Sequence, residues 1–451
     1  MSLTKATYSM IKGAPVNVLD YISGGTGTSG DPYVGWDTAT PWAANTEFKF
    51  PKGVFQYSTT LSLPYAYIYI HGVGVGTTLK FTGTGNCISF DSVSGINSPR
   101  IESLCIDGNA NATNGIYTNN ANYGVCKDVT IRNVSGAGFR SLFGVYWLIQ
   151  NFYMGSNFGA ITTYASAGIY LGLGGSASST VTAYTIINAN IAECINSGID
   201  INNGWGNTII GGAVEANQQQ GLFINTNAHD NLINNLYIEG NLVYAILCGG
   251  TGNDFIGVWC AGNSFDSPFK LTSTTTVNHI FGGVYEKIII DAGAFANGFT
   301  NSRCGIFNDS GNGTTVDNLF SAATAAYVHP TFVSSWTNNV TNPYETFTSS
   351  GSSITSAINT TGVGIANSNS FYLVGGATYI FQWFVTLNSG TLPGFVVSSN
   401  TATSATGVSV VGNNMYMITA GSSDNYYFTL RTESGIASNF ACTQINVKQI
   451  N

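Results

Sequence analysis

A short pattern recurs four times between residues 207 and 282 and limits what this chain can fold into. Each copy starts with an asparagine and an apolar run, as in Asn207-Thr208-Ile209-Ile210-Gly211. The asparagines are Asn207, Asn231, Asn253 and Asn278, at intervals of 24, 22 and 25 residues. A repeat of this length, rich in Gly, Asn, Thr and Ser, indicates a solenoid of short strands rather than helical hairpins. We therefore expect a parallel β-helix, in which residues one period apart lie about 4.8 Å from each other.

The stacked asparagines are predicted to form an internal ladder of side-chain amides that satisfies backbone groups in the bends. Segments that begin with glycine mark a second set of equivalent positions. They are Gly115-Ile116-Tyr117, Gly168-Ile169-Tyr170-Leu171, Gly198-Ile199-Asp200-Ile201 and Gly221-Leu222-Phe223-Ile224. Strand alternation places Ile199 and Ile201 on one face and Asp200 on the other.

The pattern predicts an all-β chain in four parts. Residues 1–45 read as an irregular N-terminal cap segment in which 22–45 is a Gly/Thr-rich loop, and residues 46–315 as the parallel β-helix. A stretch rich in Thr, Asn and Ser over 316–350 is predicted to be a linker. Residues 351–451 carry longer strands without the period, which indicates a C-terminal antiparallel β-sandwich that could cap the solenoid, trimerise it or bind carbohydrate.

Composition excludes several classes of function. Charged residues make up 8% of the chain and the net charge is −8, which argues against a nucleic-acid partner. No apolar run is long enough to cross a membrane, so membrane insertion is not expected, and no secretory signal is visible. The eight cysteines form no CxxC pair and are expected to be buried, reduced thiols. The histidines other than His229 are isolated, so neither a metal site nor a cofactor is predicted.

Glutamates accompany the asparagine repeat and predict a catalytic surface. Glu193, Glu215 and Glu239 end similar strand-like segments and are expected to stack at a bend on three consecutive coils. Two carboxyl groups about 5–5.5 Å apart suit a retaining glycosidase, and about 6.5–9.5 Å an inverting one; either separation is reachable here. Asp200 is the best additional acid because it points outward on its strand. The alternative is that glutamates at a stacked bend only accept backbone N–H bonds.

The chain between Arg140 and Lys270 contains no Lys or Arg but seven acids. Without a nearby cation, stacked carboxylates cannot all ionise cheaply, so at least one carboxyl pKa is expected to rise. Glycoside cleavage uses one carboxyl with a raised pKa as the acid and a neighbouring ionised carboxylate as the nucleophile or base. The same absence weighs against a polysaccharide lyase, which must neutralise a uronate carboxylate.

Aromatic side chains near the glutamates predict sugar binding, because the apolar face of a pyranose packs on a ring. These candidates for substrate binding are Trp205, Tyr237, Tyr244, Trp259 and Tyr285, with His229 as a further possibility or a turn residue. The alternative is that the aromatic residues pack between subunits.

Three segments resemble the opening coils of bacteriophage tailspikes of the pectate-lyase-like family. They are Gly13-Ala14-Pro15-Val16-Asn17-Val18-Leu19-Asp20-Tyr21, Phe50-Pro51-Lys52-Gly53-Val54-Phe55 and Ile70-His71-Gly72-Val73-Gly74-Val75-Gly76-Thr77-Thr78-Leu79. The resemblance implies a right-handed parallel β-helix, a homotrimer, a place in the virion tail and cleavage of a bacterial surface polysaccharide. The virion anchor of many relatives is not recognisable, which leaves a shortened chain or docking to phage baseplate or tail proteins through the first residues.

Four functions remain open from the sequence. The first is endo-glycosidic hydrolysis of a capsule, O-antigen or exopolysaccharide by paired carboxylates. The second is a lyase that acts by β-elimination on a uronate-containing glycan. The third is a glycan-binding adhesin without catalysis, and the fourth is a structural tail component with no glycan contact.

Overall fold

The computed structural model describes residues 14–173, 179–262 and 268–311, and beyond them chiefly the strands up to residue 449. The chain forms two compact units, residues 1–287 with 293–298 and residues 288–292 with 299–451. The described helices are single turns, η2 (Val18–Tyr21), α1 (Trp36–Ala39) and η3 (Ser156–Phe158). None of the described helices is long and apolar enough to span a membrane.

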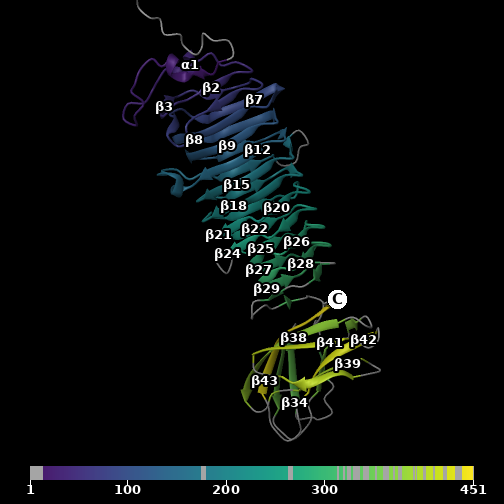
Figure 1. The fold of residues 1–451 in the computed structure, drawn as a ribbon. Helices are drawn as coiled ribbons and strands as arrows, with labels where there is room; N and C mark the ends of the chain where they lie inside the picture. The colour runs from purple at the N-terminus through teal and green to yellow at the C-terminus, as the bar shows by residue number, and fades with distance from the viewer. Residues whose placement is uncertain are drawn as a thin grey trace, which may run out of the picture. The chain divides into compact units, whose positions relative to one another are not determined.

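The first unit is a parallel β-helix whose strands stack in three columns (Figure 1). The first column contains β1 (Val16–Asn17), β2 (Glu47–Lys49), β5 (Tyr69–His71), β20 (Leu232–Asn234), β23 (Asp254–Ile256) and β26 (His279–Phe281). The second contains β3 (Gly53–Tyr57), β6 (Thr77–Phe81), β21 (Tyr237–Glu239), β24 (Trp259–Ala261) and β27 (Val284–Ile290). The strands β9 (Val125–Val134), β12 (Leu148–Met154), β15 (Thr185–Ala192) and β18 (Thr208–Glu215) run through both columns. This confirms the predicted parallel solenoid.

The third column completes each coil. It contains β4 (Leu61–Ser62), β7 (Gly85–Asn97), β10 (Ala137–Ser141), β13 (Ala167–Leu171), β16 (Ser197–Ile201), β19 (Gln220–Ile224), β22 (Tyr244–Cys248) and β25 (Phe269–Leu271). The long strand β8 (Arg100–Asn122) contributes to all three columns. A small parallel sheet of β11 (Gly144–Val145), β14 (Val181–Thr182) and β17 (Gly204–Trp205) lies beside them.

Residues with left-handed backbone make the bends between the first two columns. Asn188, Gly211, Asn235 and Gly257 occupy this position on four consecutive coils, with φ values of 53°, 60°, 52° and 62°. Glycine adopts positive φ without steric cost, and asparagine tolerates it better than most residues do. This preference explains why the repeat is so rich in Gly and Asn.

The predicted amide ladder is present inside the coil and is fully buried. Oδ1 of Asn231 accepts hydrogen bonds from both the backbone N–H and Nδ2 of Asn207, at 3.0 and 2.9 Å. The same pair of hydrogen bonds joins Asn231 to Asn253 and Asn253 to Asn278. The ladder also has a further member that was not predicted, Asn297, whose Oδ1 accepts from Nδ2 of Asn278 at 2.9 Å and which follows an interval of only 19 residues.

The N-terminal cap contains more structure than the predicted loop over 22–45. Helix α1 places Trp36 in the core with no exposed surface, and its indole N–H donates to the Gln56 carbonyl at 3.0 Å. The ring of Trp36 meets those of Phe50 and Phe55 edge-on. A buried tryptophan therefore closes the first coils from above, although the surrounding sequence is rich in glycine and threonine.

The second unit contains two antiparallel sheets. One holds β33 (Trp336–Asn338), β36 (Ile365–Ser368), β37 (Phe371–Leu373), β39 (Gly394–Ser399), β40 (Thr403–Val408) and β42 (Asp424–Arg431). The other holds β34 (Glu345–Ser350), β35 (Ser353–Ile358), β38 (Thr378–Ser389), β41 (Gly412–Thr419) and β43 (Asn439–Gln449). Trp383 of one sheet contacts Phe395 and Phe428 of the other, as expected of a sandwich.

The predicted linker over 316–350 contains β33 and β34, and much of the rest of it lies outside the described residues. The three boundaries between the four predicted parts stay predictions.

Candidate functional site

Glu215 and Glu239 occupy equivalent positions on adjacent coils. Glu215 ends β18 and Glu239 ends β21, and the two are paired in the parallel register of these strands. Their backbones are therefore one strand spacing apart, about 4.8 Å. Both side chains are half-buried, and their inward-pointing neighbours Val214 and Ile238 lie in the core.

Glu193 does not belong to this stack, which corrects the predicted three-coil arrangement. The residue paired with Glu215 on the preceding coil is Ala192, so Glu193 stands one position further along. It has left-handed backbone, with φ of 64°, like Ala216 at 52° and Gly240 at 64° on the next two coils. Its carboxylate accepts hydrogen bonds from the backbone N–H and the hydroxyl of Ser156, both at 2.8 Å.

Tyr237 and Trp259 line the same face beside the two glutamates. The register pairs Tyr237 with Trp259, and their rings meet edge-on at 6.0 Å. The Tyr237 hydroxyl donates to Oε2 of Glu239 at 2.6 Å. This hydrogen bond to the carboxylate raises the pKa of Tyr237 to about 12. Trp259 exposes 52% of its surface, so its ring is available to a ligand. We call Glu215, Glu239, Tyr237 and Trp259 the acid strip.

Tyr285 lies in the core and takes no part in the acid strip. It is paired with Cys260, whose side chain points inward, and it is 1% exposed. Its ring contacts Phe269 at 5.5 Å. The following residue, Glu286, accepts a hydrogen bond from the Gly262 backbone N–H at 3.0 Å, and burial raises its pKa.

The remaining predicted aromatic residues lie on other parts of the coil. Tyr244 belongs to the third column, where the ammonium of Lys270 lies 5.9 Å from its ring. Trp205 is half exposed on the small parallel sheet, and its ring meets that of His229 at 5.9 Å. These residues are separate from the acid strip, and their part in substrate binding stays a prediction.

Asp200 belongs to a second outward-facing group, which we call the Asp200 cluster and which also contains Arg140 and Tyr170. The register stacks the three side chains on successive coils of the third column. The guanidinium of Arg140 lies over the Tyr170 ring, 5.1 Å from its centre. Oδ1 of Asp200 and Nε of Arg140 are both withdrawn from solvent and have no hydrogen-bond partner.

Burial dominates the electrostatics of the Asp200 cluster. It raises the pKa of Asp200 to about 7, against the opposing effects of Arg140 and of a hydrogen bond with Asn202. Burial and the neighbouring Asp200 carboxylate likewise raise the pKa of Tyr170. Perturbed acids of this kind gather at functional sites, although buried ion pairs produce them too.

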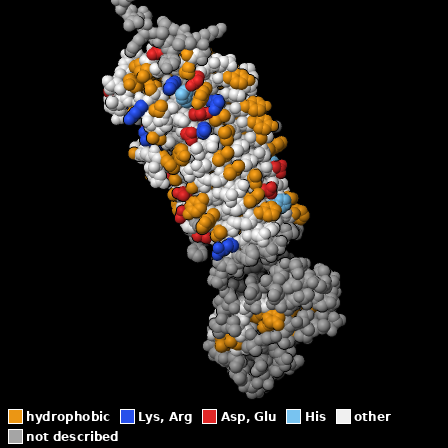
Figure 2. All heavy atoms as spheres, in the orientation of Figure 1, with side chains coloured by type: hydrophobic (Ala, Val, Ile, Leu, Met, Phe, Trp, Pro, Cys, Tyr) orange, Lys and Arg blue, Asp and Glu red, His pale blue; other side chains and the backbone are white. Residues whose placement is uncertain are grey.

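Arg140 and Asp200 are far apart in sequence, but successive turns of the coil place them in the same stacked column. The two residues are two strand spacings apart, about 10 Å between backbones. The signal was present in the glycine-led segments, where Gly138-Phe139-Arg140 matches Gly168-Ile169-Tyr170 and Gly198-Ile199-Asp200. On the face shown in Figure 2, Lys and Arg side chains gather over the first coils and reappear only near the end of the described coils.

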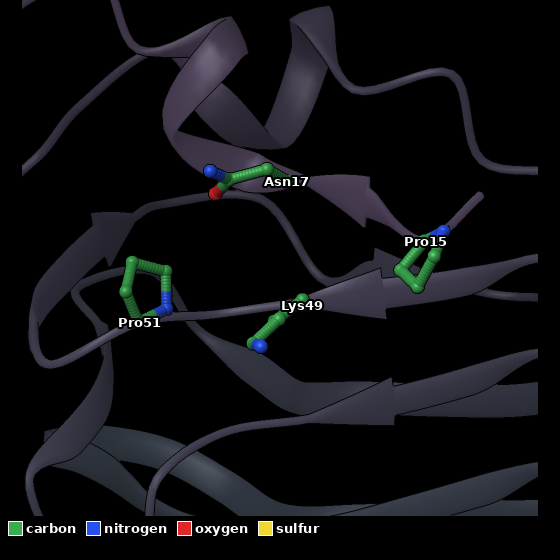
Figure 3. Close-up of a pocket in the computed structure, with 4 residues that line it drawn as sticks. All are labelled: Pro15, Asn17, Lys49 and Pro51. Carbon is green, nitrogen blue, oxygen red and sulfur yellow. The ribbon is translucent and has the colours of Figure 1, made fainter. Parts of the chain in front are cut away.

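A pocket lies on the first coils, where Pro15, Asn17, Lys49 and Pro51 line it (Figure 3). None of these four described residues carries a carboxylate. Among the residues that the structure describes, no group of three or more His, Cys, Asp or Glu side chains could hold a metal ion. The acids of the acid strip and of the Asp200 cluster are therefore the groups best placed for chemistry.

Solved structures similar to this chain include phage tailspikes. The enzymatically active domain of tailspike protein 2 of bacteriophage CBA120 is 12% identical, over 97% of this chain and 82% of that chain, with a TM-score of 0.50. The chain is similar in fold to a phage tailspike. Tailspike protein 4 of the same phage is 11% identical over 97% of this chain and 68% of that chain, with a TM-score of 0.46.

The similar solved structures also include a module of an epimerase. The A-module of mannuronan C-5 epimerase AlgE6 of Azotobacter vinelandii is 14% identical over 68% of this chain and 99% of that chain, with a TM-score of 0.45. No family model matches the sequence, and a search of curated proteins finds no match. The tailspike likeness concerns the fold, and the activity must be argued from the side chains.

Proposed function

We propose that this chain is a phage tailspike that binds a bacterial surface polysaccharide and cleaves it by endo-glycosidic hydrolysis. The observation that carries the proposal is the register of Glu215 with Glu239, one strand spacing apart beside an exposed tryptophan. The tailspike-like fold supports it. In such a role the protein is a component of the virion tail, is made in the host cytoplasm and acts at the outer cell surface.

In the proposed mechanism the two glutamates flank the glycosidic bond. A backbone spacing of about 4.8 Å, with parallel side chains, is close to the separation of about 5–5.5 Å between carboxyl groups in retaining enzymes. One glutamate attacks the anomeric carbon, and the other protonates the leaving oxygen and later activates water. The hydroxyl of Tyr237 donates to Oε2 of Glu239 at 2.6 Å and holds this carboxyl in place, so we assign Glu239 as the nucleophile and Glu215 as the acid.

Trp259 is proposed to hold the sugar next to the reacting bond. Its ring is half exposed and fixed edge-on against Tyr237, so it offers an apolar surface beside the carboxylates. Carbohydrate rings pack on such surfaces while their hydroxyls bond the polar rim. The chemistry requires no metal or cofactor.

The Asp200 cluster favours a lyase as the second candidate. β-Elimination needs a cation that neutralises a uronate carboxylate and a group that moves the proton. Arg140 has an unpaired Nε and lies over Tyr170, so the pair offers a cation and a phenol together. Because its pKa is raised, the Tyr170 hydroxyl stays protonated near neutral pH, so its place in such a reaction is to protonate the leaving oxygen rather than to abstract the proton beside the carboxylate.

Product analysis separates these candidates. Purified bacterial surface polysaccharides are incubated with the protein, and the new chain ends are read by mass spectrometry and ultraviolet absorbance. Hydrolysis adds one water per cut and produces no absorbance. An absorbing unsaturated uronate would replace the hydrolase with the lyase, and binding without any product would favour the adhesin.

A further inference from the structure

The outward column that holds Tyr237 and Trp259 contains a third aromatic residue further toward the N-terminus, Tyr153. The register pairs Tyr153 with Asn190, Asn190 with Ala213, and Ala213 with Tyr237. Tyr153 and Tyr237 are therefore three strand spacings apart, about 14 Å. Between them the column holds only the small side chains of Asn190 and Ala213.

Tyr153 is half of a second aromatic pair. Its ring lies 5.0 Å from that of Phe158, tilted by 44°. Phe158 ends η3, which is the start of an insertion over residues 155–166 between β12 and β13. Both rings are only partly buried, so each keeps some surface in contact with solvent.

Two side chains fasten this insertion to the coil. Glu193 accepts both hydrogen bonds from Ser156, at 2.8 Å each. Asn133 Oδ1 accepts from the backbone N–H and hydroxyl of Thr162, at 2.7 and 3.2 Å. Glu193 directly follows Ala192, the neighbour of Glu215, so the fastening stands one coil from the acid strip.

We propose that Tyr153 and Phe158 form a second sugar-binding platform at the N-terminal end of the acid strip, and that Glu193 positions it. This inference rests on the proposed function and extends it, because it assigns a direction to the glycan. The polysaccharide lies along the coil axis, with one part against Tyr237 and Trp259 and a part several sugars away against Tyr153 and Phe158. The short side chains of Ala192 and Ala213 do not obstruct the surface between the two platforms, so a polysaccharide can lie across it.

The assignment gives Glu193 a role different from that of the other glutamates. Both of its carboxylate oxygens are engaged by Ser156, and its backbone lies in a bend rather than on the strand. Ser156 and the first turn of the insertion would lose their anchor without it. Glu193 is thus a positioning residue whose loss weakens binding of long substrates rather than the bond-breaking step.

Substitution of Phe158 tests the platform. The probe is the surface polysaccharide that the wild-type protein binds, partially hydrolysed in acid and separated by chain length. We expect Phe158→Ala to raise KM, or Kd, about 3- to 10-fold for long fragments while leaving the shortest cleaved fragment unchanged. The matched control is Tyr146→Ala, which removes a 56% exposed aromatic residue of a different bend. Equal affinities for wild type and Phe158→Ala at every fragment length would overturn the platform.

Substitution of Glu193 tests its positioning role. Glu193→Ala should raise KM for long fragments as Phe158→Ala does, with kcat within about twofold, and Glu193→Gln should have a smaller effect because one acceptor remains. A large fall of kcat in Glu193→Gln would make Glu193 a reacting acid instead. If the protein binds glycans without cutting them, hydrolysis fails but the Kd values still decide the platform; absence of binding to any polysaccharide tested would overturn both.

Discussion

The side-chain amide of Asn231 donates to Oδ1 of Asn253 at 2.9 Å, inside a coil where neither residue is exposed beyond 1%. The same oxygen also accepts the backbone N–H of Asn231 at 3.1 Å. One buried atom thus satisfies two donors of the preceding coil and fixes the register of the strands that follow. The coils that this ladder joins also carry the acid strip.

Removal of one ladder member should destabilise the coil strongly. Asn253→Ala leaves the N–H and the amide of Asn231 without their acceptor, at a cost on the order of 1–3 kcal/mol for each orphaned group. Chemical denaturation followed by circular dichroism measures the loss. Gln218→Ala, at an exposed position after β18, should change stability by no more than about 0.5 kcal/mol. Similar losses in the two variants would contradict the structural role of the ladder.

Replacement of either strip glutamate should stop cleavage and spare binding. Glu215→Gln and Glu239→Gln keep the shape of the side chain but remove the acid or nucleophile, so kcat should fall by at least about 100-fold. Reducing-end release and direct binding to the same polysaccharide measure the two effects. Asp254→Asn, an exposed acid of the first column, is the control and should keep full activity. Retained cleavage in both glutamine variants would move the chemistry elsewhere, with Asp200 as the next acid to replace.

Loss of the Trp259 ring should weaken substrate binding without harming the fold. Trp259→Ala removes a half-exposed side chain, and we expect KM to rise several-fold while the melting temperature changes little. Trp205→Ala is the informative comparison, because Trp205 is equally exposed on a different sheet. A larger effect from Trp205 than from Trp259 would place the glycan over the small parallel sheet instead of over the acid strip.

Asp200 should make the protein less stable as the pH rises. The pKa of this carboxyl is raised from 3.8 to about 7 in the folded chain, so between these values the folded state keeps a proton that the unfolded state releases. Stability then falls through this window, by up to about 1.4 kcal/mol per pH unit, and is level above it. Asp200→Asn should flatten the profile of denaturation midpoint against pH. Asp230→Asn, at an exposed bend, should retain the wild-type slope.

The protein should be a trimer in solution. Ile210, Ile256 and Phe281 are outward residues of one stacked column and expose 37%, 38% and 45% of their surfaces. An apolar sheet face of this kind is usually covered by another subunit. Light scattering should give about three times the chain mass of 47.5 kDa. A mass near that of one chain would contradict the expected assembly.

The repeat made the fold and the ladder predictable, because only a residue with a specific task recurs at such constant spacing. Glu193 was predicted one position away from where it lies. On later coils Asn217 and Asn241 mark the end of the equivalent segment, but Cys194 occupies that position on the coil of Glu193, so this marker is absent there. The prediction of Tyr285 as a substrate-binding residue was wrong for a different reason. The repeat matches Tyr285 with Ile238 and Cys260, both of which point inward, so its place in the core could have been predicted.

The Asp200 cluster could be found only in part from the sequence. Asp200 was recognisable as an outward acid, but its raised pKa depends on how deeply the neighbouring coils bury it. The contact of Arg140 with Tyr170 crosses a gap of 30 residues that includes the insertion over 155–166. The insertion breaks the regular spacing of the repeat, so the pairing of Arg140 with Tyr170 could not be predicted by counting residues and is seen only in the folded strands.

The parallel register of Glu215 with Glu239 has a consequence for how such a protein can change. Loss or gain of one coil shifts every later side chain by one strand spacing. Two acids on different coils can therefore be brought nearer or moved apart only in multiples of about 4.8 Å. Separations between these values can arise only from the lengths and rotamers of the side chains themselves. A lineage built this way would switch between reaction geometries in discrete jumps.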